Sequence, residues 1–337
     1  MELSELWFVL IGVLFVGFFF LEGFDYGVGI LLPFVGKTDK ERRVVINSIG
    51  PVWDANEVWL LTAGGAMFAA FPHWYATMFS GFYLALFVIL FGLIIRGVAF
   101  EFRSKADDVR WRRTWDYAIF LGSLIPAILF GVAFANIVRG MAIDETMTYT
   151  GTFFDLLNPY SLVGGLVTLS LFILHGALFL EMKTEGEIRE RVQAITRPAW
   201  FAAVVLTVGF VLFSFVDTTM FDSVNPVQVV SLLGTVGALL FAGFNLFRAR
   251  FGLAFIGNGL AIVGVVALLF SSLFPNVMPS TTDVAYSLTV YNASSTEYTL
   301  SIMTVVALFF VPLVLMYQGW TYWVFRKRVT TDSHLEY

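Results

Sequence analysis

The sequence predicts an all-α membrane protein, a polytopic bundle of transmembrane helices, on three observations. Apolar residue types make up 58% of the 337 residues and charged types only 13%, whereas soluble domains average roughly 45–50% and about 25%. Aromatic residues reach 17%, with 37 Phe among them. Long apolar segments recur along the whole chain. A soluble protein of this size could not keep so much apolar surface away from water.

Nine segments are long and apolar enough to cross a bilayer, which takes about 20 residues in a helix. The first lacks a basic leader and an A-x-A-like cleavage site, so we expect a retained span rather than a signal peptide. No linker or internal repeat divides the chain, which predicts one integral-membrane domain over residues 1–337. The predicted spans cover roughly residues 6–32, 52–71, 76–100, 116–138, 161–182, 199–216, 226–247, 251–274 and 299–325.

The distribution of basic residues predicts the orientation of the bundle. Eighteen of the twenty Lys and Arg residues fall in alternate connections and in the tail, Arg139 falls on the opposite side, and Arg96 lies within a span. Cytoplasmic loops are enriched in basic residues, so we expect the N-terminus outside and the C-terminus in the cytoplasm. The eighteen are Lys37, Lys40, Arg42, Arg43, Arg103, Lys105, Arg110, Arg112, Arg113, Lys183, Arg189, Arg191, Arg197, Arg248, Arg250, Arg326, Lys327 and Arg328.

Several classes of function are excluded by composition. The net charge of -5 argues against a nucleic-acid binder with a broad basic surface. The absence of Cys rules out disulfides and thiolate chemistry. The sequence contains no phosphate-binding G-x-x-x-x-G-K-[ST] loop and no H-E-x-x-H or Glu-x-x-His metal motif. We therefore expect no metal ligands and no cofactor ligated by this chain.

Ionisable residues inside spans are costly and are candidates for functional sites. The first span contains Glu22 and Asp25, three residues apart and hence on one helix face. The second begins with Asp54 and Glu57, again three apart. Carboxylates that converge on the cytoplasmic side suggest a proton entry route. The alternatives are that Asp54 and Glu57 offset the dipole of a helix N-terminus and that Glu22 has only a structural role.

Two further charged residues lie at the end of the third predicted span. Arg96 is inside it and Glu101 is at its edge. Arg96 either neutralises a carboxylate such as Asp54 or extends to the cytoplasmic headgroups. Glu101 is either part of a proton entry or a solvated residue at the membrane surface.

The three histidines limit any haem site in this chain. His175 is the one within a span, whereas His73 follows a Pro at an outer turn and His334 is in the tail. A lone His in an apolar helix is more often a hydrogen-bonded interior residue than a haem ligand. A copper-containing oxidase core or a two-haem cytochrome needs several such ligands, so redox chemistry belongs to a partner. The outer connection 275–298 is uncharged except for two residues and is expected to be a packed cap.

Several blocks of sequence resemble subunit II of the cytochrome bd-type quinol oxidases, in order and over nearly the whole chain. The resemblance is carried by LEGFDYGVGILLPF, NSIGPVWDANEVWLLTAGGAMFAAFP, RGVAFEFRSK, FGVAFANIVRG, LTVYNASSTEYTL and YQGWTYWVF. It implies a subunit of a prokaryotic plasma-membrane complex that oxidises quinol, reduces dioxygen to water and generates a proton gradient. It also implies that two b-type haems and haem d belong to subunit I, the partner in a pseudo-symmetric heterodimer. Very small extra subunits often join this complex.

The resemblance also assigns roles to single residues. Asp25 matches the acid of the family's GFD motif, and Asp54 matches the acid of its W-[DE]-x-N motif. The resemblance implies that these two residues, with Glu57 and Glu101, form a proton pathway toward the haems of subunit I. Glu57 falls where some relatives have an amide. Arg96 is expected to face subunit I and to balance negative charge there.

Two other functional interpretations of the sequence remain. Intramembrane carboxylates also mark transport pathways, so a stand-alone proton-coupled transporter is the main alternative. Transporters often show paired half-sequences with interrupted helices, and none is evident here. A purely structural scaffold would share the fold and the partner without using the carboxylates.

Overall fold

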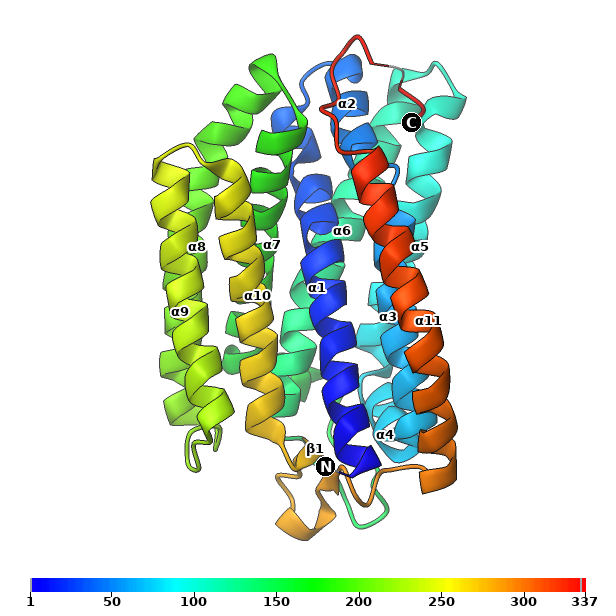
Figure 1. Ribbon diagram of the computed structural model, residues 1–337, viewed down its shortest axis with the longest axis vertical. Coiled ribbons are helices and arrows are strands. Elements are labelled where there is room, and N and C mark those ends of the chain that lie inside the picture. The colour runs from blue at the N-terminus through cyan, green and yellow to red at the C-terminus, as the bar shows by residue number, and fades with distance from the viewer. Residues whose placement is uncertain (1, 334) are drawn as a thin grey trace.

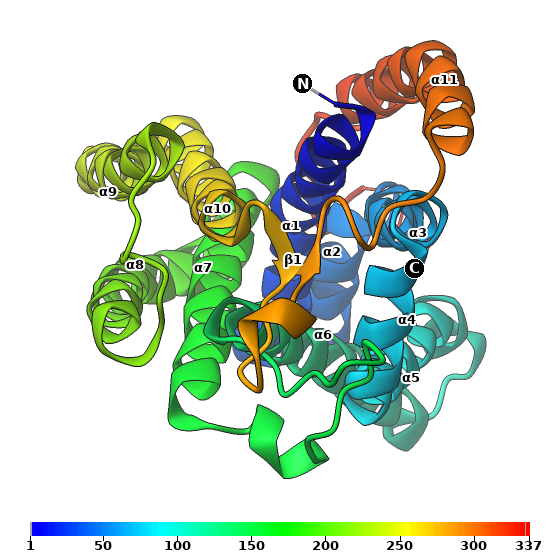
Figure 2. The ribbon, with the colours of Figure 1, turned by 90° about the horizontal axis from the view of Figure 1, so that it is seen from below.

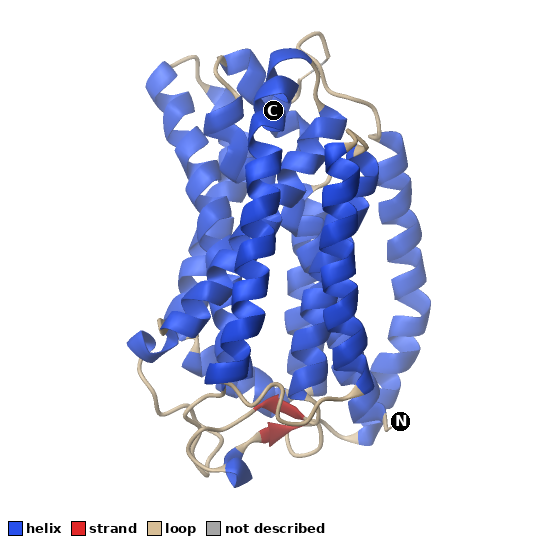
Figure 3. Ribbon diagram, turned by 90° about the vertical axis from the view of Figure 1, so that its left-hand side faces the viewer, coloured by secondary structure: helices blue, strands red, loops and turns tan. Residues whose placement is uncertain are grey.

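The computed structural model describes residues 2–333 and 335–337, so His334 lies outside the described residues. These residues form a bundle of long helices that run along one axis, with a small strand pair at one end (Figures 1 and 3). The helices are α1 (Leu3–Val35), α2 (Asp39–Ile49), α3 (Trp53–Ala70), α4 (Pro72–Gly81), α5 (Tyr83–Phe102), α6 (Val109–Arg139), α7 (Pro159–Lys183), α8 (Gly186–Asp217), α9 (Pro226–Phe247), α10 (Phe251–Leu273) and α11 (Glu297–Val324). Three short 3₁₀ turns, η1 (Arg103–Lys105), η2 (Phe153–Leu156) and η3 (Val284–Tyr286), lie in the connections.

Helix α1 is the centre of the bundle. It contacts α3, α6, α7 and α10 along its length, and the end-on view shows these helices around it (Figure 2). Its 33 residues give a length of about 50 Å at 1.5 Å per residue, more than the roughly 30 Å of a bilayer's hydrocarbon core. The helix is thus longer than the hydrocarbon core is thick, and every residue from Glu22 to Leu32 is buried.

The prediction of nine apolar spans was wrong for one segment. Among the described residues, eight helices are long and apolar enough to cross a membrane, and α3 is not one of them. Its 18 residues extend about 27 Å, and Asp54, Asn56 and Glu57 make its first turns polar. Helix α3 nevertheless runs beside α1 and contacts α11, because its polar side chains find partners inside the bundle.

The two termini lie at opposite ends of the bundle (Figure 1). The connections that carry most of the basic residues are at the end that holds the C-terminus, and the strand pair is at the end that holds the N-terminus (Figures 1 and 3). The placement of either end outside or in the cytoplasm stays a prediction.

The connection between α10 and α11 packs onto the end of the bundle. Strand β1 (Asn276–Met278) pairs antiparallel with β2 (Leu288–Thr289), with an irregularity in the register. Val277, Met278 and Leu288 are buried. A bridge between Met141 and Ser280 joins the α6–α7 connection to the same cap. The expected packed cap is confirmed.

Glycines allow α1 and α7 to approach closely at the level of the buried acidic residues. A Cβ atom on Gly27 would lie 2.8 Å from the Cα atom of Gly176, closer than real Cβ atoms pack. Small residues are how membrane helices bring their backbones together. The crossing fixes how α1 is placed and therefore where its carboxylates point.

Substitution Gly27→Ala is expected to destabilise the bundle. The added methyl group would force α1 and α7 apart, at a cost of about 1–3 kcal/mol, as in other overpacked cores. The readout is the midpoint of thermal inactivation of the purified complex. Gly209→Ala is the control, since a Cβ at Gly209 meets nothing within 4 Å. Equal effects of the two substitutions would contradict the role of the crossing.

Candidate functional site

A cluster of ionisable side chains is enclosed between α1, α3 and α5. Glu22 and Asp25 of α1 are fully buried, and so is Arg96 of α5. The spacing of three residues places both carboxylates on the face of α1 that packs against α3, and the side chain of Arg96 reaches Glu22 from α5. Because ionised groups at this depth are costly, each must find compensation within the cluster.

Arg96 is the positive centre of the cluster. Its Nη2 donates a hydrogen bond to Glu22 Oε1, and the same nitrogen lies 3.8 Å from Glu57 Oε2. The guanidinium also lies over the ring of Tyr26, 4.7 Å from its centroid, where a cation is attracted by the π-face. One guanidinium thus ties α5 to both α1 and α3.

Asp25 is held by an amide instead of a cation. Asn56 Nδ2 donates to Asp25 Oδ2 at 2.7 Å. The other carboxylate oxygen, Oδ1, is buried and has no hydrogen-bond partner among the described residues. Asp25 is therefore held through one of its two carboxylate oxygens.

The amide of Asn56 is itself fixed by α11. Its Oδ1 accepts hydrogen bonds from Gln318 Nε2 at 3.1 Å and from the Tyr322 hydroxyl at 2.7 Å. Trp59 Nε1 donates to Gln318 Oε1 at 2.9 Å. Two acceptor bonds at the oxygen determine which way the amide points, so Asn56 must present its NH₂ group to Asp25.

The structure brings only some of the predicted site residues together. Asp25, Glu57 and Arg96 belong to the buried cluster, whereas Asp54 and Glu101 are exposed. Arg96 pairs with Glu22 and Glu57 and not with Asp54. Its side chain is enclosed by this chain's own helices, so the expectation that it faces a partner subunit is wrong.

Asp54 and Glu101 are both at the end of the bundle that holds the C-terminus. Tyr337 packs there against the α2 region, where Asn47 Nδ2 donates to its carbonyl oxygen at 2.9 Å. Burial, together with the carboxylates of Glu101 and Asp54, raises the pKa of Tyr337. Both predicted entry residues thus lie within electrostatic range of Tyr337.

Other members of the cluster were missed or given a lesser role by the sequence reasoning. Glu22, for which a structural role was the alternative, is the main partner of Arg96. Asn56, Gln318 and Tyr322 were not singled out. The signal for them was present, because Asn56 stands between two acidic residues and Gln318 is a polar residue within the last apolar span.

Glu57 connects the cluster with a large cavity. About 570 Å³ of space lies between α3, α4, α5 and α6 and reaches α1. Glu57 is the charged residue in its wall, and its side chain is 23% exposed. The rest of the lining is mostly apolar and includes Gly64, Phe68, Phe87, Leu90 and Phe130.

His175 lies apart from this cluster. It is fully buried, its ring stacks on Phe255 with centroids 4.2 Å apart, and its Nε2 lies 3.1 Å from the carbonyl oxygen of Phe20. The expectation of a hydrogen-bonded interior residue is confirmed, and His73 is exposed as expected. Within residues 2–333 and 335–337, no group of three or more His, Asp or Glu is placed to hold a metal ion.

Comparisons with known proteins agree with this architecture. The family model of cytochrome bd terminal oxidase subunit II matches residues 3–325. The chain belongs to this family. It is therefore a subunit of a bacterial terminal oxidase and a multi-pass protein of the respiratory membrane.

Individual relatives match over their full length. Cytochrome bd ubiquinol oxidase subunit 2 of Bacillus subtilis is 44% identical over 336 residues, which are 100% of this chain and 99% of the relative. Cytochrome bd-I ubiquinol oxidase subunit 2 of Escherichia coli K12 is 38% identical over 368 residues, covering 98% and 96%. A chain of the bd oxidase structure from Geobacillus thermodenitrificans shares the fold, with a TM-score of 0.78, 16% identity and coverage of 97% and 100%.

The buried ion pair is expected to be essential for stability. Arg96→Met leaves the carboxylates of Glu22 and Glu57 without their cation, a loss that typically costs about 3–5 kcal/mol. The double variant Glu22→Gln/Arg96→Met should recover part of that loss, because it removes both charges. The measurement is the free energy of unfolding in a double-mutant cycle.

A matched pair of charges is available at the surface. Arg139 Nε and Asp217 Oδ2 are 2.6 Å apart, with side chains 39% and 30% exposed. Arg139→Met should cost no more than about 1 kcal/mol. A cost for Arg96→Met as small as this would show that the buried pair does not support the fold.

Proposed function

We propose that this chain supports the haem-bearing subunit I of a quinol-oxidising bd complex and supplies it with cytoplasmic protons for the reduction of dioxygen to water. The observation that carries the proposal is the buried cluster of Glu22, Asp25, Glu57 and Arg96. Relatives of this chain are named ubiquinol oxidase subunits. Proton uptake during quinol oxidation and oxygen reduction would generate a proton gradient.

The positions of the acidic residues suggest a direction of transfer. Asp54 and Glu101 are exposed at the end of the bundle that we expect to face the cytoplasm, and Asp54 is one helical turn from Glu57. Glu57 lies beside Arg96, and Arg96 lies beside Glu22. Asp25 lies one turn from Glu22 on α1, on the side nearer the C-terminal end, and its Oδ1 has no hydrogen-bond partner among the described residues. In this proposal the exposed pair collects protons and the buried carboxylates pass them on.

Within residues 2–333 and 335–337, the histidines do not fit a haem ligand set. The ring of His175 is stacked on Phe255, and its Nε2 is directed at the carbonyl oxygen of Phe20. His73 is exposed. We therefore assign the two b-type haems and haem d to the partner, and the mechanism for this chain contains no step on a haem.

Helix α11 supports a role in a complex. Among its residues only Leu300 and Gln318 are buried, so it offers apolar surface along nearly its whole length to lipid and to other subunits. The proposed assembly is a pseudo-symmetric heterodimer with subunit I, joined by very small single-span subunits. A stand-alone transporter does not account for membership of an oxidase subunit family.

Asp25→Asn is expected to slow oxygen reduction by about tenfold or more, since positioned proton-transfer groups contribute on the order of 10²-fold or greater. The amide keeps the shape but cannot carry a proton. Apparent quinol affinity should stay unchanged, because the residue acts on proton uptake. The readouts are single-turnover oxygen reduction and proton uptake by the assembled complex.

Two variants serve as comparisons for Asp25→Asn. Asp283→Asn changes an exposed acid at the opposite end of the bundle and should leave turnover intact. Asp54→Asn should slow turnover less than Asp25→Asn, because Glu101 is a second exposed acid at the same end of the bundle. Reduced quinol affinity with normal single-turnover oxygen reduction in Asp25→Asn would refute the relay. Unchanged turnover of Asp54→Asn at every pH would remove Asp54 from the route.

A further inference from the structure

A second cavity lies in the half of the bundle that the proton pathway does not use. About 300 Å³ of space is enclosed by α7, α8, α9 and α10. Its lining is apolar except for the hydroxyl groups of Thr207 and Thr235. No charged residue lines it, so it does not belong to the carboxylate cluster.

The cavity opens sideways between α8 and α9. Both helices are long and apolar enough to cross the membrane, and several lining residues from them are also exposed on the outside of the bundle. Trp200 of α8 bridges the seam by donating from Nε1 to the carbonyl oxygen of Leu239 at 2.9 Å. The exposed lining residues are Val208, Leu212, Leu233, Val236 and Leu240.

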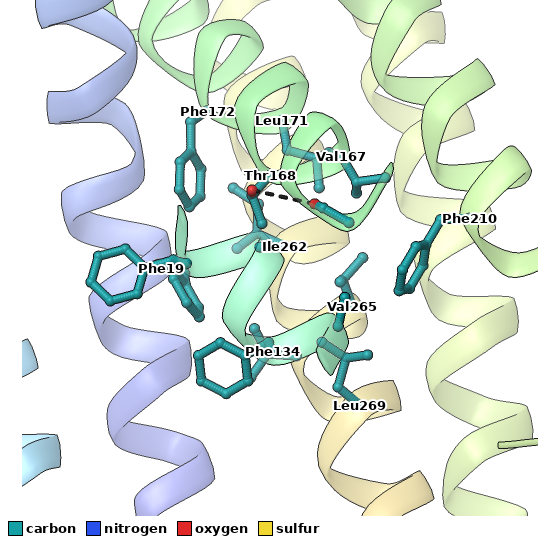
Figure 4. A pocket seen from close by; sticks show the side chains of 15 residues that line it. Phe19, Phe134, Val167, Thr168, Leu171, Phe172, Phe210, Ile262, Val265 and Leu269 are labelled. Atoms are coloured by element: carbon teal, nitrogen blue, oxygen red, sulfur yellow. Dashed lines mark hydrogen bonds between the residues drawn. The ribbon is translucent and has the colours of Figure 1, made fainter. Parts of the chain in front are cut away.

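The inner end of the cavity reaches the core of the bundle. Val167, Phe210, Val265 and Leu269 line both this cavity and a smaller pocket of about 40 Å³ beside α1. Figure 4 shows Phe210 on one side of that pocket and Phe19 on the opposite side. The opening is therefore a slot that runs inward from the lipid-facing surface.

Water is a poor occupant for this slot. A buried water molecule needs two to four polar partners. Thr235 Oγ1 already donates to the carbonyl oxygen of Ser231 at 2.8 Å. Thr207 Oγ1 has no hydrogen-bond partner among the described residues, and one hydroxyl cannot hold water alone. The medium outside the opening is hydrocarbon, so an alkyl chain matches the slot.

Two basic residues lie at the distance from the cavity at which the headgroup of a bound lipid would be. Arg197 and Arg248 are exposed near the same end of α8 and α9, with their guanidinium groups 5.5 Å from the Phe247 ring and 4.0 Å from the Phe244 ring. Ten residues separate Arg197 from Thr207, about 15 Å along a helix. That is half the roughly 30 Å hydrocarbon thickness, the depth an acyl chain spans in one leaflet.

We propose that the slot between α8 and α9 binds one acyl chain of a membrane phospholipid whose phosphate lies against Arg197 and Arg248. Arg is well suited to phosphate because its planar group donates several hydrogen bonds at once. The acyl chain enters between α8 and α9 beside Trp200 and fills space that would otherwise be empty. Filling this space holds α8 against the α9–α10 pair.

The test counts phospholipids that stay bound. The whole oxidase complex is reconstituted in nanodiscs of deuterated phosphatidylglycerol, returned to detergent, and analysed by native mass spectrometry. Val208→Trp fills the slot and should remove one retained phospholipid per complex. Arg197→Gln/Arg248→Gln leaves the lining of the slot unchanged and should lower the occupancy of that lipid by half or more.

Val230→Trp is the matched control. Val230 is an exposed residue of α9 outside the slot, so the variant should retain as many phospholipids as the unaltered complex. Equal counts in Val208→Trp and Val230→Trp would overturn the proposal. So would the loss of a neutral isoprenoid lipid, and not of a phospholipid, from Val208→Trp. If Val208→Trp fails to assemble, an unchanged count in the double Arg variant overturns it.

Discussion

The pairing of Arg96 with Glu22 is the interaction on which the rest of the structure depends. Both side chains are fully buried in a chain that crosses a membrane, where an uncompensated charge is expensive. The pair links α5 to α1 through one side chain, and Glu57 brings α3 to the same guanidinium. Removing Arg96 would leave the buried carboxylate of Glu22 without its cation.

The remaining acid of the cluster has a different kind of partner. Asp25 receives a hydrogen bond from an amide and no ion-pair partner of its own. Asn56, Gln318 and Tyr322 form the supporting network that holds that amide. Helix α11, otherwise exposed, thereby contributes to the geometry of a carboxylate on the central helix. A fixed donor at one oxygen and a free second oxygen is the arrangement a relay residue requires.

The buried charged groups and the apolar cavity between α8 and α9 lie in different parts of the bundle. Helices α1, α3, α5 and α11 hold the charged and amide groups, and the close crossing of α1 on α7 at Gly27 and Gly176 sets their position. Helices α7 to α10 enclose apolar space with two hydroxyl groups in its lining. The proposed proton supply thus concentrates on one side of the bundle, and the proposed lipid site lies on the other.

Much of this could be predicted from the sequence, and the rest depends on three-dimensional neighbours. The length of the apolar segments predicted the helices, and the spacing of Glu22 and Asp25 predicted that both lie on one helix face. Successive helical residues turn by about 100°, so Asp54, Asn56 and Glu57 cannot all point inward, and only the structure shows that Asp54 is exposed. The pairing of Arg96 with Glu22 joins residues 74 apart, which no local pattern reveals. The polar start of α3 explains why a criterion based on apolarity finds eight spans among the described residues where nine were predicted.

The central claim is that Asp25 gains and loses a proton during turnover, and infrared difference spectroscopy of the assembled oxidase tests it most directly. Reduction and reoxidation of the complex should produce a protonated-carboxyl band that is absent in Asp25→Asn and retained in Asp283→Asn. A difference spectrum of Asp25→Asn that keeps every carboxyl band, together with full oxygen reduction, would contradict the account.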